Sequence, residues 1–493
     1  MVLVVADLAR ERPDESALRD ERTDLSWGEL NRSLNRAVHA LTGTPGRVAV
    51  MAENAAESLL AHTALLFAGV SAVPVNAHLT APEAEYLLAT GDVSLVLAGP
   101  RTYEVAAEAA ARVGARLVSW RTDGSWEALL AAASDAEPPH AHPPAPPLMF
   151  TSGTTGRPKA TEIPPTMFPA AADIPGLLEG IRAHGLHGLG RHLVVGPLHH
   201  TGPLTAARLL AVGNPVTVLG RFDAARLLEV VERDRIATSV MVPTHFVRLL
   251  ALADRSRYDV SSLRSVAQTG ASCPVEVKRQ MIEWWGPVLV ESYGATEVGV
   301  VSAIESDEWL QHPGSVGRPV PPFEALVLDE QGRPCPTGTA GELWFRDTTG
   351  RGLVYAHTPE AFTPRTDGLF TLGEAGYVDA DGYLYITDRV SDMVVSGGVN
   401  IYPAEVENVL ADHPGVHDAG GIGLPDPDLG ERLVVLVELA DANVTPAELI
   451  EWCRERLAHY KCPREIVVVP ALPRTTMGKL DKRALRASHL ASA

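Results

Sequence analysis

The feature that most constrains the fold is an alternation of helical patterns and short apolar runs near the start of the chain. Residues 27–41 have a helical pattern, residues 46–52 form an apolar run typical of a buried strand, and residues 57–76 indicate a second helix that enters another strand. The first helix is expected to place four apolar side chains on one face: Leu30, Leu34, Ala37 and Leu41. Because neighbouring parallel strands need a long crossover connection, usually a helix, this alternation predicts a parallel α/β sheet.

The pattern changes beyond Pro319. Segments 325–346 and 376–389 have the alternation and turn residues of β-hairpins. A helix is then expected to begin at Pro403, because proline suits the first helical position.

The length of the chain predicts more than one domain, because 493 residues exceed one ordinary hydrophobic core. We place the boundary where the hairpin pattern ends. The expected fold class is α/β, with a large N-terminal domain (residues 1–388) of mixed and parallel sheets and a small α+β C-terminal domain (residues 389–493).

The composition excludes several classes of protein. A formal net charge of −19 at pH 7 argues against a partner bound mainly through phosphate charge, such as duplex DNA. No run approaches the roughly 18 apolar residues of a membrane span, and the first residues lack the features of a secretion signal. The four cysteines are widely spaced, without the paired spacing of metal ligands, which is typical of a reducing compartment. We therefore expect a soluble, cytoplasmic protein.

A decapeptide rich in glycine and hydroxyl groups, TSGTTGRPKA (residues 151–160), directly follows an expected strand at 148–150. It lacks the GxxxxGK[ST] spacing of a Walker A motif. Exposed backbone N–H groups, hydroxyls and a lysine are nevertheless the donors that hold a polyphosphate. Taken alone, the decapeptide is either a flexible surface turn or a loop that approaches a ligand closely.

Four further segments accompany this loop. ESYGATEVG (291–299) follows an apolar stretch and therefore lies at the end of an expected strand, where parallel sheets collect ligands. The others are PLHHTG (197–202), DGYLYITDRVSDMVVSGGVNIYPAEVE (381–407) and LPRTTMGK (472–479). In this order and at these distances the five motifs resemble those of the adenylate-forming superfamily, which includes acyl-CoA synthetases, peptide-synthetase adenylation domains and luciferases. The resemblance covers nearly the whole chain.

The resemblance implies a reaction in two steps. A carboxylate attacks the α-phosphate of ATP, giving an acyl-adenylate and pyrophosphate, and a thiol such as that of CoA then takes the acyl group. It also implies a small β-barrel-like part in the N-terminal domain and a mobile C-terminal domain that rotates between the two steps. A homodimer is expected only on the ground of this resemblance.

The resemblance assigns roles to individual residues. Thr296 is expected to contact the α-phosphate, and Glu297 to hold Mg²⁺. Lys479 is the expected adenylation lysine, a positioned cation that stabilises developing negative charge. The expected phosphate loop comprises Thr151, Ser152, Gly153, Thr154, Thr155, Gly156 and Lys159.

The remaining roles concern the nucleoside, the acid and CoA. Tyr293 is expected to stack on adenine opposite a wall formed by Gly270, Ala271 and Ser272, and Arg389 to reach the ribose. Gly397 and Gly398 of SGGVN would line a pantetheine tunnel. His200 matches the histidine at the mouth of the acyl pocket, whose lining is expected from Val242–Phe246, Gln268–Gly270 and Gly294–Val301. Gly294 and Ala295 are small, and a medium-sized aryl or unsaturated acid is the expected substrate.

Three positions depart from the family pattern. Glu374 stands where the ribose-binding aspartate is normally found, so its carboxylate is shifted by one methylene. Ser391 replaces the hinge aspartate or lysine, and Ala160 replaces a glycine after Lys159. These departures leave the second half-reaction less constrained than the first.

Three functions therefore remain open. The first is an acid–CoA ligase. The second is an adenylating enzyme with another acceptor or activated group: a carrier protein, an amine, or nitrite activated for diazotisation. The third is a non-catalytic nucleotide-binding protein, against which Thr155, Lys159, Glu297 and Lys479 weigh.

Overall fold

The fold was analysed in a computed structural model of the chain. It describes residues 4–151, 158–183, 185–271, 273, 275–329, 331–354, 368–389, 394–401, 403–473 and 482–492. Among these residues, no helix combines the length and the apolar character needed to cross a bilayer.

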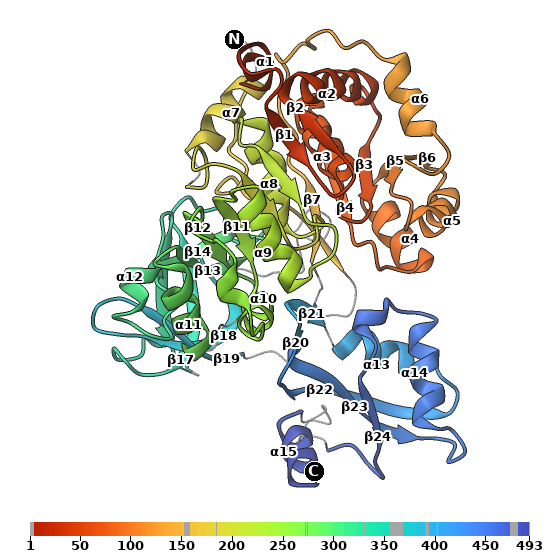
Figure 1. Ribbon diagram of the computed structural model, residues 1–493. Coiled ribbons are helices and arrows are strands. Elements are labelled where there is room, and N and C mark those ends of the chain that lie inside the picture. The colour runs from red at the N-terminus through yellow and green to blue at the C-terminus, as the bar shows by residue number, and fades with distance from the viewer. Residues whose placement is uncertain are drawn as a thin grey trace.

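A nine-stranded mixed sheet forms the centre of the N-terminal part (Figure 1). In spatial order its strands are β15 (Arg318–Pro319), β14 (Gly299–Glu305), β13 (Leu289–Ala295), β12 (Ser265–Gln268), β11 (Thr238–Met241), β9 (His192–Val194), β10 (Val216–Val218), β1 (Ser16–Arg19) and β2 (Asp24–Ser26). The run from β13 to β1 is parallel throughout, and the strands at both edges are antiparallel. Helices of this part are α1 (Val4–Glu11), α2 (Trp27–Leu41), α7 (Ile174–Arg182), α8 (Thr201–Ala211), α9 (Ala224–Arg233), α10 (Pro243–Leu250), α11 (Val275–Trp285) and α12 (Ser306–Trp309).

A second sheet of four parallel strands has the order β4 (Ala72–Val75), β3 (Arg47–Met51), β5 (Val93–Ala98) and β6 (Arg116–Ser119). Its helices are α3 (Ala56–Ala68), α4 (Ala81–Thr90), α5 (Tyr103–Val113) and α6 (Ser125–Ala132). The parallel α/β sheet predicted from the first segments of the chain is thereby confirmed. Beside it lies a short hairpin of β7 (Leu148–Thr151) and β8 (Lys159–Glu162).

The helix expected at residues 27–41 is present with those bounds. Its start is fixed by a capping box, in which the Glu29 N–H donates to Ser26 Oγ and the Ser26 N–H donates to Glu29 Oε2, over 3.3 and 3.0 Å. The four apolar side chains predicted to share one face are all buried in the core. Local capping and one apolar stripe together determine this element.

Two antiparallel pairs follow the nine-stranded sheet and confirm both predicted hairpins. The strands β16 (Phe323–Leu328), β17 (Gly341–Asp347), β18 (Leu369–Val378) and β19 (Leu384–Arg389) form one four-stranded sheet. This antiparallel sheet stands at the place of the expected β-barrel-like part.

The C-terminal part has a five-stranded sheet of its own, shown in blue at the lower right of Figure 1. Its strands are β20 (Val394–Ser396), β21 (Val399–Ile401), β22 (Val416–Asp426), β23 (Gly430–Leu439) and β24 (Glu465–Val468), and its helices are α13 (Pro403–Ala411), α14 (Pro446–Arg454) and α15 (Lys482–Ser492). It packs on a core of its own. The predicted α+β character of this part, and the helix that begins at Pro403, are confirmed.

Candidate active site

A cavity of about 2220 Å³ lies between the carboxyl ends of the parallel strands and the C-terminal sheet. Strands β9, β11, β12 and β13 all point their ends towards it, as expected for ligand sites of parallel sheets. The volume exceeds that of a typical pocket for one drug-sized ligand, so the cavity has room for more than one substrate. The predicted residues that line it are Thr151, Lys159, His200, Gly270, Ala271, Tyr293, Thr296, Glu297, Glu374, Gly397 and Gly398.

Several predicted residues lie outside the part of the chain that the structure describes. These are Ser152, Gly153, Thr154, Thr155, Gly156, Ser272, Ser391 and Lys479. Arg389 ends β19, but its side chain is likewise outside the described part. The roles given to them stay predictions.

The two ends of the decapeptide are held in register. Thr151 closes β7 and faces Lys159 at the start of β8, so the intervening loop is the turn of a hairpin. Thr151 Oγ1 also donates a hydrogen bond of 2.8 Å to Glu297 Oε1. This contact ties the loop to the turn after β13, although the two residues are far apart in the sequence.

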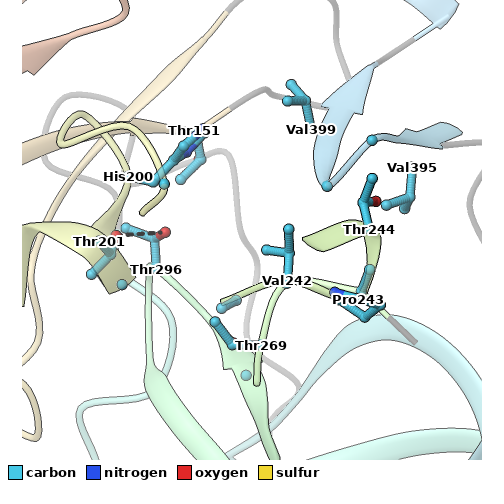
Figure 2. A pocket seen from close by; sticks show the side chains of 18 of the residues that line it. Thr151, His200, Thr201, Val242, Pro243, Thr244, Thr269, Thr296, Val395 and Val399 are labelled. Carbon is cyan, nitrogen blue, oxygen red and sulfur yellow. Dashed lines mark hydrogen bonds between the residues drawn. The ribbon is translucent and has the colours of Figure 1, made fainter. Parts of the chain in front are cut away.

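Thr296 and Glu297 occupy the turn between the antiparallel strands β13 and β14. Thr296 Oγ1 lies 3.2 Å from Thr201 Oγ1, at the first residue of α8 (Figure 2). The α8 N-terminus therefore points its unpaired backbone N–H groups at the cavity, an arrangement that favours anionic ligands. Sequence analysis named Thr296 but not Thr201, although Thr201 belongs to the same PLHHTG motif as His200.

The Glu297 side chain is 8% exposed, and the backbone at this residue is held from a third segment. Arg351 Nη1 donates to the Glu297 carbonyl oxygen over 3.0 Å. Burial lowers the pKa of the Arg351 guanidinium. Sequence analysis missed Arg351 because it lies in a loop outside every recognised motif.

The turn that holds Glu297 also requires a glycine. A Cβ added at Gly294 would lie 1.9 Å from the Gly299 carbonyl oxygen, so β13 and β14 approach each other more closely than any side chain allows. The small size of Gly294 was predicted to leave room for the acid. The structure adds a reason from the backbone, because the β-bulge between Tyr293 and Gly294 brings the two strands together.

Tyr293 and Glu374 meet directly. Tyr293 donates its hydroxyl hydrogen to Glu374 Oε2 over 2.7 Å, and Glu374 is 8% exposed. The extra methylene that distinguishes glutamate from the expected aspartate thus brings the carboxylate to the tyrosine. The predicted adenine-stacking residue and the predicted ribose acceptor form one hydrogen-bonded unit.

Two histidines enter the cavity side by side. The rings of His199 and His200 are 4.3 Å apart, and removal from water lowers the pKa of His200 to about 4 and that of His199 well below its ordinary value. Both rings are neutral near pH 7. His200 can therefore donate or accept a hydrogen bond there but does not supply a positive charge.

The neutral histidines predict how stability depends on pH. Burial lowers the pKa values of His62 to about 3 and of His245 to about 4. The unfolded chain binds protons with an ordinary histidine pKa near 6.5, so it binds more protons than the folded chain between pH 6.5 and 4. Stability is therefore expected to fall with pH, by about 1.4 kcal/mol per pH unit for each such histidine.

Urea unfolding at several pH values between 7 and 4.5 measures this dependence. His245→Gln should flatten the slope, whereas His459→Gln, at an exposed position, should leave it unchanged. Equal slopes in the wild type and His245→Gln would contradict the assignment.

The turn at Gly397 and Gly398 faces the opposite wall of the cavity. Val395 and Val399, from β20 and β21, lie across from Val242, Pro243 and Thr244 at the start of α10 (Figure 2). Both glycines have positive φ, +59° and +78°. A Cβ at Gly398 would lie 2.8 Å from Val242 Cγ2, so glycine is needed for this close approach.

The C-terminal part is anchored on the other side of the cavity by polar contacts. Lys461 Nζ lies 3.2 Å from Glu83 Oε1 of α4 and 2.8 Å from Glu405 Oε2 of α13. Asn76 Nδ2 donates to Tyr460 Oη over 2.9 Å. These contacts hold the turn at Gly398 against α10.

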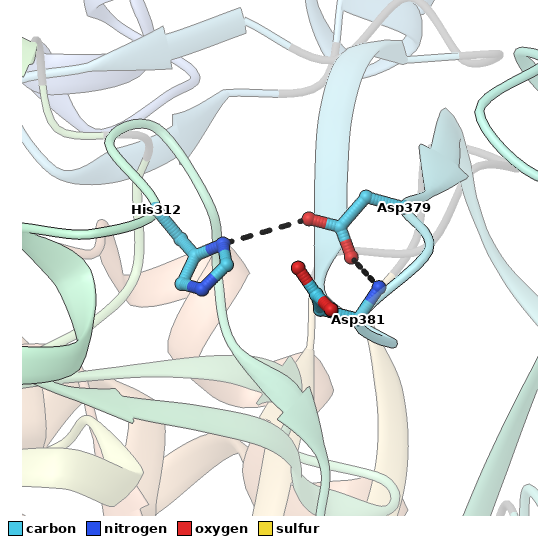
Figure 3. Close-up of side chains that lie close together, drawn as sticks. All are labelled: His312, Asp379 and Asp381. Carbon is cyan, nitrogen blue, oxygen red and sulfur yellow. Dashed lines mark hydrogen bonds and ion pairs between the residues drawn. The ribbon is translucent and has the colours of Figure 1, made fainter.

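A separate cluster of His312, Asp379 and Asp381 lies outside the cavity (Figure 3). Asp379 Oδ1 accepts the backbone N–H groups of Asp381 and Tyr383, over 3.0 and 2.9 Å, which closes the turn between β18 and β19. Its Oδ2 faces His312 Nδ1 at 3.6 Å, and the His312 ring stacks on Tyr383. These contacts explain the cluster as a stabilised turn.

Comparison with known families identifies the site. The model of the AMP-binding enzyme family matches residues 5–352, and the model of the AMP-binding enzyme C-terminal domain matches residues 405–479. The chain belongs to the AMP-binding enzyme family. It is accordingly an ATP-dependent, AMP-forming ligase of the adenylate-forming superfamily, as the motifs predicted, and the non-catalytic alternative is not supported.

Relatives within the AMP-binding family cover almost the whole chain. An indoleacetate–CoA ligase of Aromatoleum aromaticum is 31% identical over 96% of this chain and 95% of its own length. A feruloyl-CoA synthase of an Amycolatopsis species is 33% identical over 97% of this chain and 96% of its own. Among solved structures, an amide bond synthetase of Marinactinospora thermotolerans superposes with a TM-score of 0.85 at 28% identity, covering 99% of both chains.

One solved enzyme reports on the arrangement of the two parts. A double mutant of o-succinylbenzoate CoA synthetase from Bacillus subtilis, bound to a product analogue, superposes with a TM-score of 0.80 at 27% identity, over 99% of this chain and 98% of its own. The same enzyme in complex with its acyl-adenylate superposes with a TM-score of only 0.65. Because the two sequences are nearly identical, the difference reflects the domain arrangement. The arrangement of this chain is nearer to that of the product complex.

Proposed function

We propose that the chain is an acid–CoA ligase that acts on a medium-sized aryl or unsaturated carboxylic acid. The observation that carries this proposal is that the Gly397–Gly398 turn and the residues Thr296 and Glu297 line one cavity. An acyl-adenylate made at Thr296 would then lie within reach of a thiol that passes beside the turn.

In the first step, a carboxylate oxygen of the acid attacks the α-phosphorus of ATP, and the bond to the bridging oxygen breaks as pyrophosphate leaves. Thr296 and the α8 N-terminus are placed to hold the α-phosphate, and we assign Lys479 to the developing charge. In the second step, the CoA sulfur attacks the acyl carbon, its proton is released, and AMP leaves.

The residues present fit a magnesium ion. Glu297 lines the cavity with a carboxylate, the ligand type that Mg²⁺ prefers, and Thr151 already orients one of its oxygens. Glu297 would hold Mg²⁺, which when bound offsets negative charge on the phosphates. Glu297 and Thr151 themselves position the phosphate loop against the turn after β13.

The substrate class is supported by the lining and by the relatives. Small and apolar residues line the part of the cavity between α8 and the sheet, among them Gly202, Val240 and Ala267. The two curated relatives are named for the aromatic acids indoleacetate and ferulate. Both observations favour a flat, medium-sized acid.

An amine acceptor is the second candidate. The resemblance to an amide bond synthetase, with a TM-score of 0.85, favours it specifically. It keeps the first step and replaces the CoA sulfur with an amine nitrogen. A carrier protein and nitrite activation remain outcomes of the test.

The decisive experiment measures pyrophosphate release from ATP and Mg²⁺ with a panel of aryl, cinnamyl and fatty acids, each with CoA, with an amine, or with neither. A separate arm contains nitrite and an aryl amine. Release that needs one acid and rises with CoA supports the ligase. Release indifferent to CoA, or provoked only by nitrite, would overturn the proposed acceptor.

Glu374→Gln tests the nucleoside site. The amide can still accept from Tyr293 but loses the charge that strengthens hydrogen bonds from ribose hydroxyls, so we expect the KM for ATP to rise about tenfold. The kcat should change much less. Steady-state pyrophosphate release at varied ATP gives both constants, and Tyr293→Phe tests the partner separately. An unchanged KM in Glu374→Gln would remove Glu374 from the nucleoside site.

We also propose the boundary at residues 388–389, a cytoplasmic location and a homodimer. Strand β19 ends at Arg389 in the last N-terminal sheet, and β20 begins the C-terminal sheet at Val394, which supports the boundary. All four cysteines are free thiols, in keeping with a reducing compartment. The homodimer rests on the family resemblance, and sedimentation of the purified chain tests it.

A further inference from the structure

Arg208 is a buried cation without a matching anion. It lies on α8, only 3% exposed, and Nη2 donates 2.8 Å to Thr205 Oγ1 on the same helix. Within the residues that the structure describes, neither aspartate nor glutamate forms an ion pair with Arg208. Thr205 is a neutral acceptor and cannot balance the charge.

Other buried charges in the chain are paired. Lys278, which is fully buried, lies 2.5 Å from the Glu291 carboxylate, and the buried Asp234 side chain is held by Arg19 and Arg233. An unpaired charge in an apolar interior costs several kcal/mol. Arg208 is therefore an exception that needs a physical explanation.

A small cavity adjoins this arginine. It measures about 20 Å³ and lies between α3 and α8. The residues that line it are His62, Leu66, Val70, Ala72, Ala145, Pro147, Phe168, Leu204, Ala207 and Arg208. Among them only His62 and Arg208 carry polar side chains, and His62 Nδ1 is buried without a hydrogen-bond partner.

The size of the cavity limits its occupant. A single water needs roughly 10–15 Å³ on this measure, so there is room for one small particle but not for phosphate or a carboxylic acid. Burial lowers the pKa of Arg208 to about 10, which leaves the guanidinium charged at pH 7. A water molecule would not neutralise that charge, whereas a halide would.

We propose that the cavity between Arg208 and His62 binds one monoatomic anion, chloride under ordinary ionic conditions. The site is separate from the catalytic cavity, but both involve α8. The helix begins at Thr201, which contacts Thr296, and carries Arg208 two turns later. The anion would therefore stabilise the helix that presents its N-terminus to the active site.

Thermal unfolding in sodium chloride, bromide and gluconate at one ionic strength tests this proposal without depending on the enzymatic activity. Gluconate is too large for the cavity. We expect the Tm to be higher by roughly 2 °C in chloride than in gluconate, because only the folded chain offers the site. The shift should saturate as chloride is titrated against gluconate.

Arg208→Met should abolish the difference between the salts. In gluconate its Tm should equal or exceed that of the wild type, because the substitution removes an uncompensated buried charge. The matched control is Arg226→Met on α9, which replaces an arginine already paired with Glu229 and should keep the chloride effect. This control also corrects for general salt effects.

A crystal soaked in bromide provides a direct measurement on the wild-type chain, whatever the folding of the variants. An anomalous difference peak between Arg208 and His62 is the expected result. Equal Tm values in the three salts, or the absence of a bromide peak in this cavity, would overturn the proposal.

Discussion

Replacing Glu297 by glutamine should lower acid-dependent pyrophosphate release by about 100- to 1000-fold, the range typical for loss of one preorganised electrostatic group. The change is nearly isosteric, and the amide oxygen can still accept the hydrogen bond from Thr151. It therefore removes the negative charge and leaves the contact to the phosphate loop. The Mg²⁺ concentration needed for half-maximal release should rise as well.

Glu305→Gln is the matched control for this prediction. Glu305 lies at the end of β14, lines the same cavity and is exposed, so its substitution removes the same charge at a greater distance from Thr296. Release by this variant should stay near that of the wild type. If Glu297→Gln behaved like Glu305→Gln, with an unchanged Mg²⁺ requirement, Glu297 would not be the metal ligand.

Local patterns in the sequence predicted those elements whose cause is local. The helix at 27–41 follows from the capping box of Ser26 and Glu29 and from one apolar stripe. Strand β22 was missed, because its segment contains Gly420, Gly421 and Gly423, and glycine disfavours strands. Its reason is tertiary, since a Cβ at Gly421 would lie 2.6 Å from Pro403 Cβ at the start of α13.

The candidate site shows the same division. Motif order was sufficient to name Thr296, Glu297 and Tyr293, because each belongs to a recognisable run. Contacts between distant segments were not predictable, among them that of Thr201 with Thr296 and that of Tyr293 with Glu374. The sequence did show that Glu374 departs from the pattern, but only the fold shows which side chain its extra methylene reaches.

The last prediction separates the two half-reactions. Gly398→Ala would place a Cβ 2.8 Å from Val242 Cγ2, and valine has little rotamer freedom with which to move away. In this arrangement the turn is pressed against α10. We therefore expect thioester formation to fall by about 10- to 100-fold, the effect of roughly 1–3 kcal/mol of overpacking, while formation of the acyl-adenylate is largely kept.

Gly397→Ala is a matched control because it shares the backbone strain without the collision. Its φ is also positive, so alanine is strained there too, but its Cβ would meet only the end of the Leu429 side chain, at 3.3 Å. Single-turnover measurements of acyl-AMP and of acyl-CoA separate the two steps. Val242→Ala in the Gly398→Ala background should restore part of the second step, since it removes the methyl groups that collide. Equal losses in Gly397→Ala and Gly398→Ala would assign the effect to strain in the turn, and equal losses in both steps would show that the contact does not belong to the thiol-transfer arrangement.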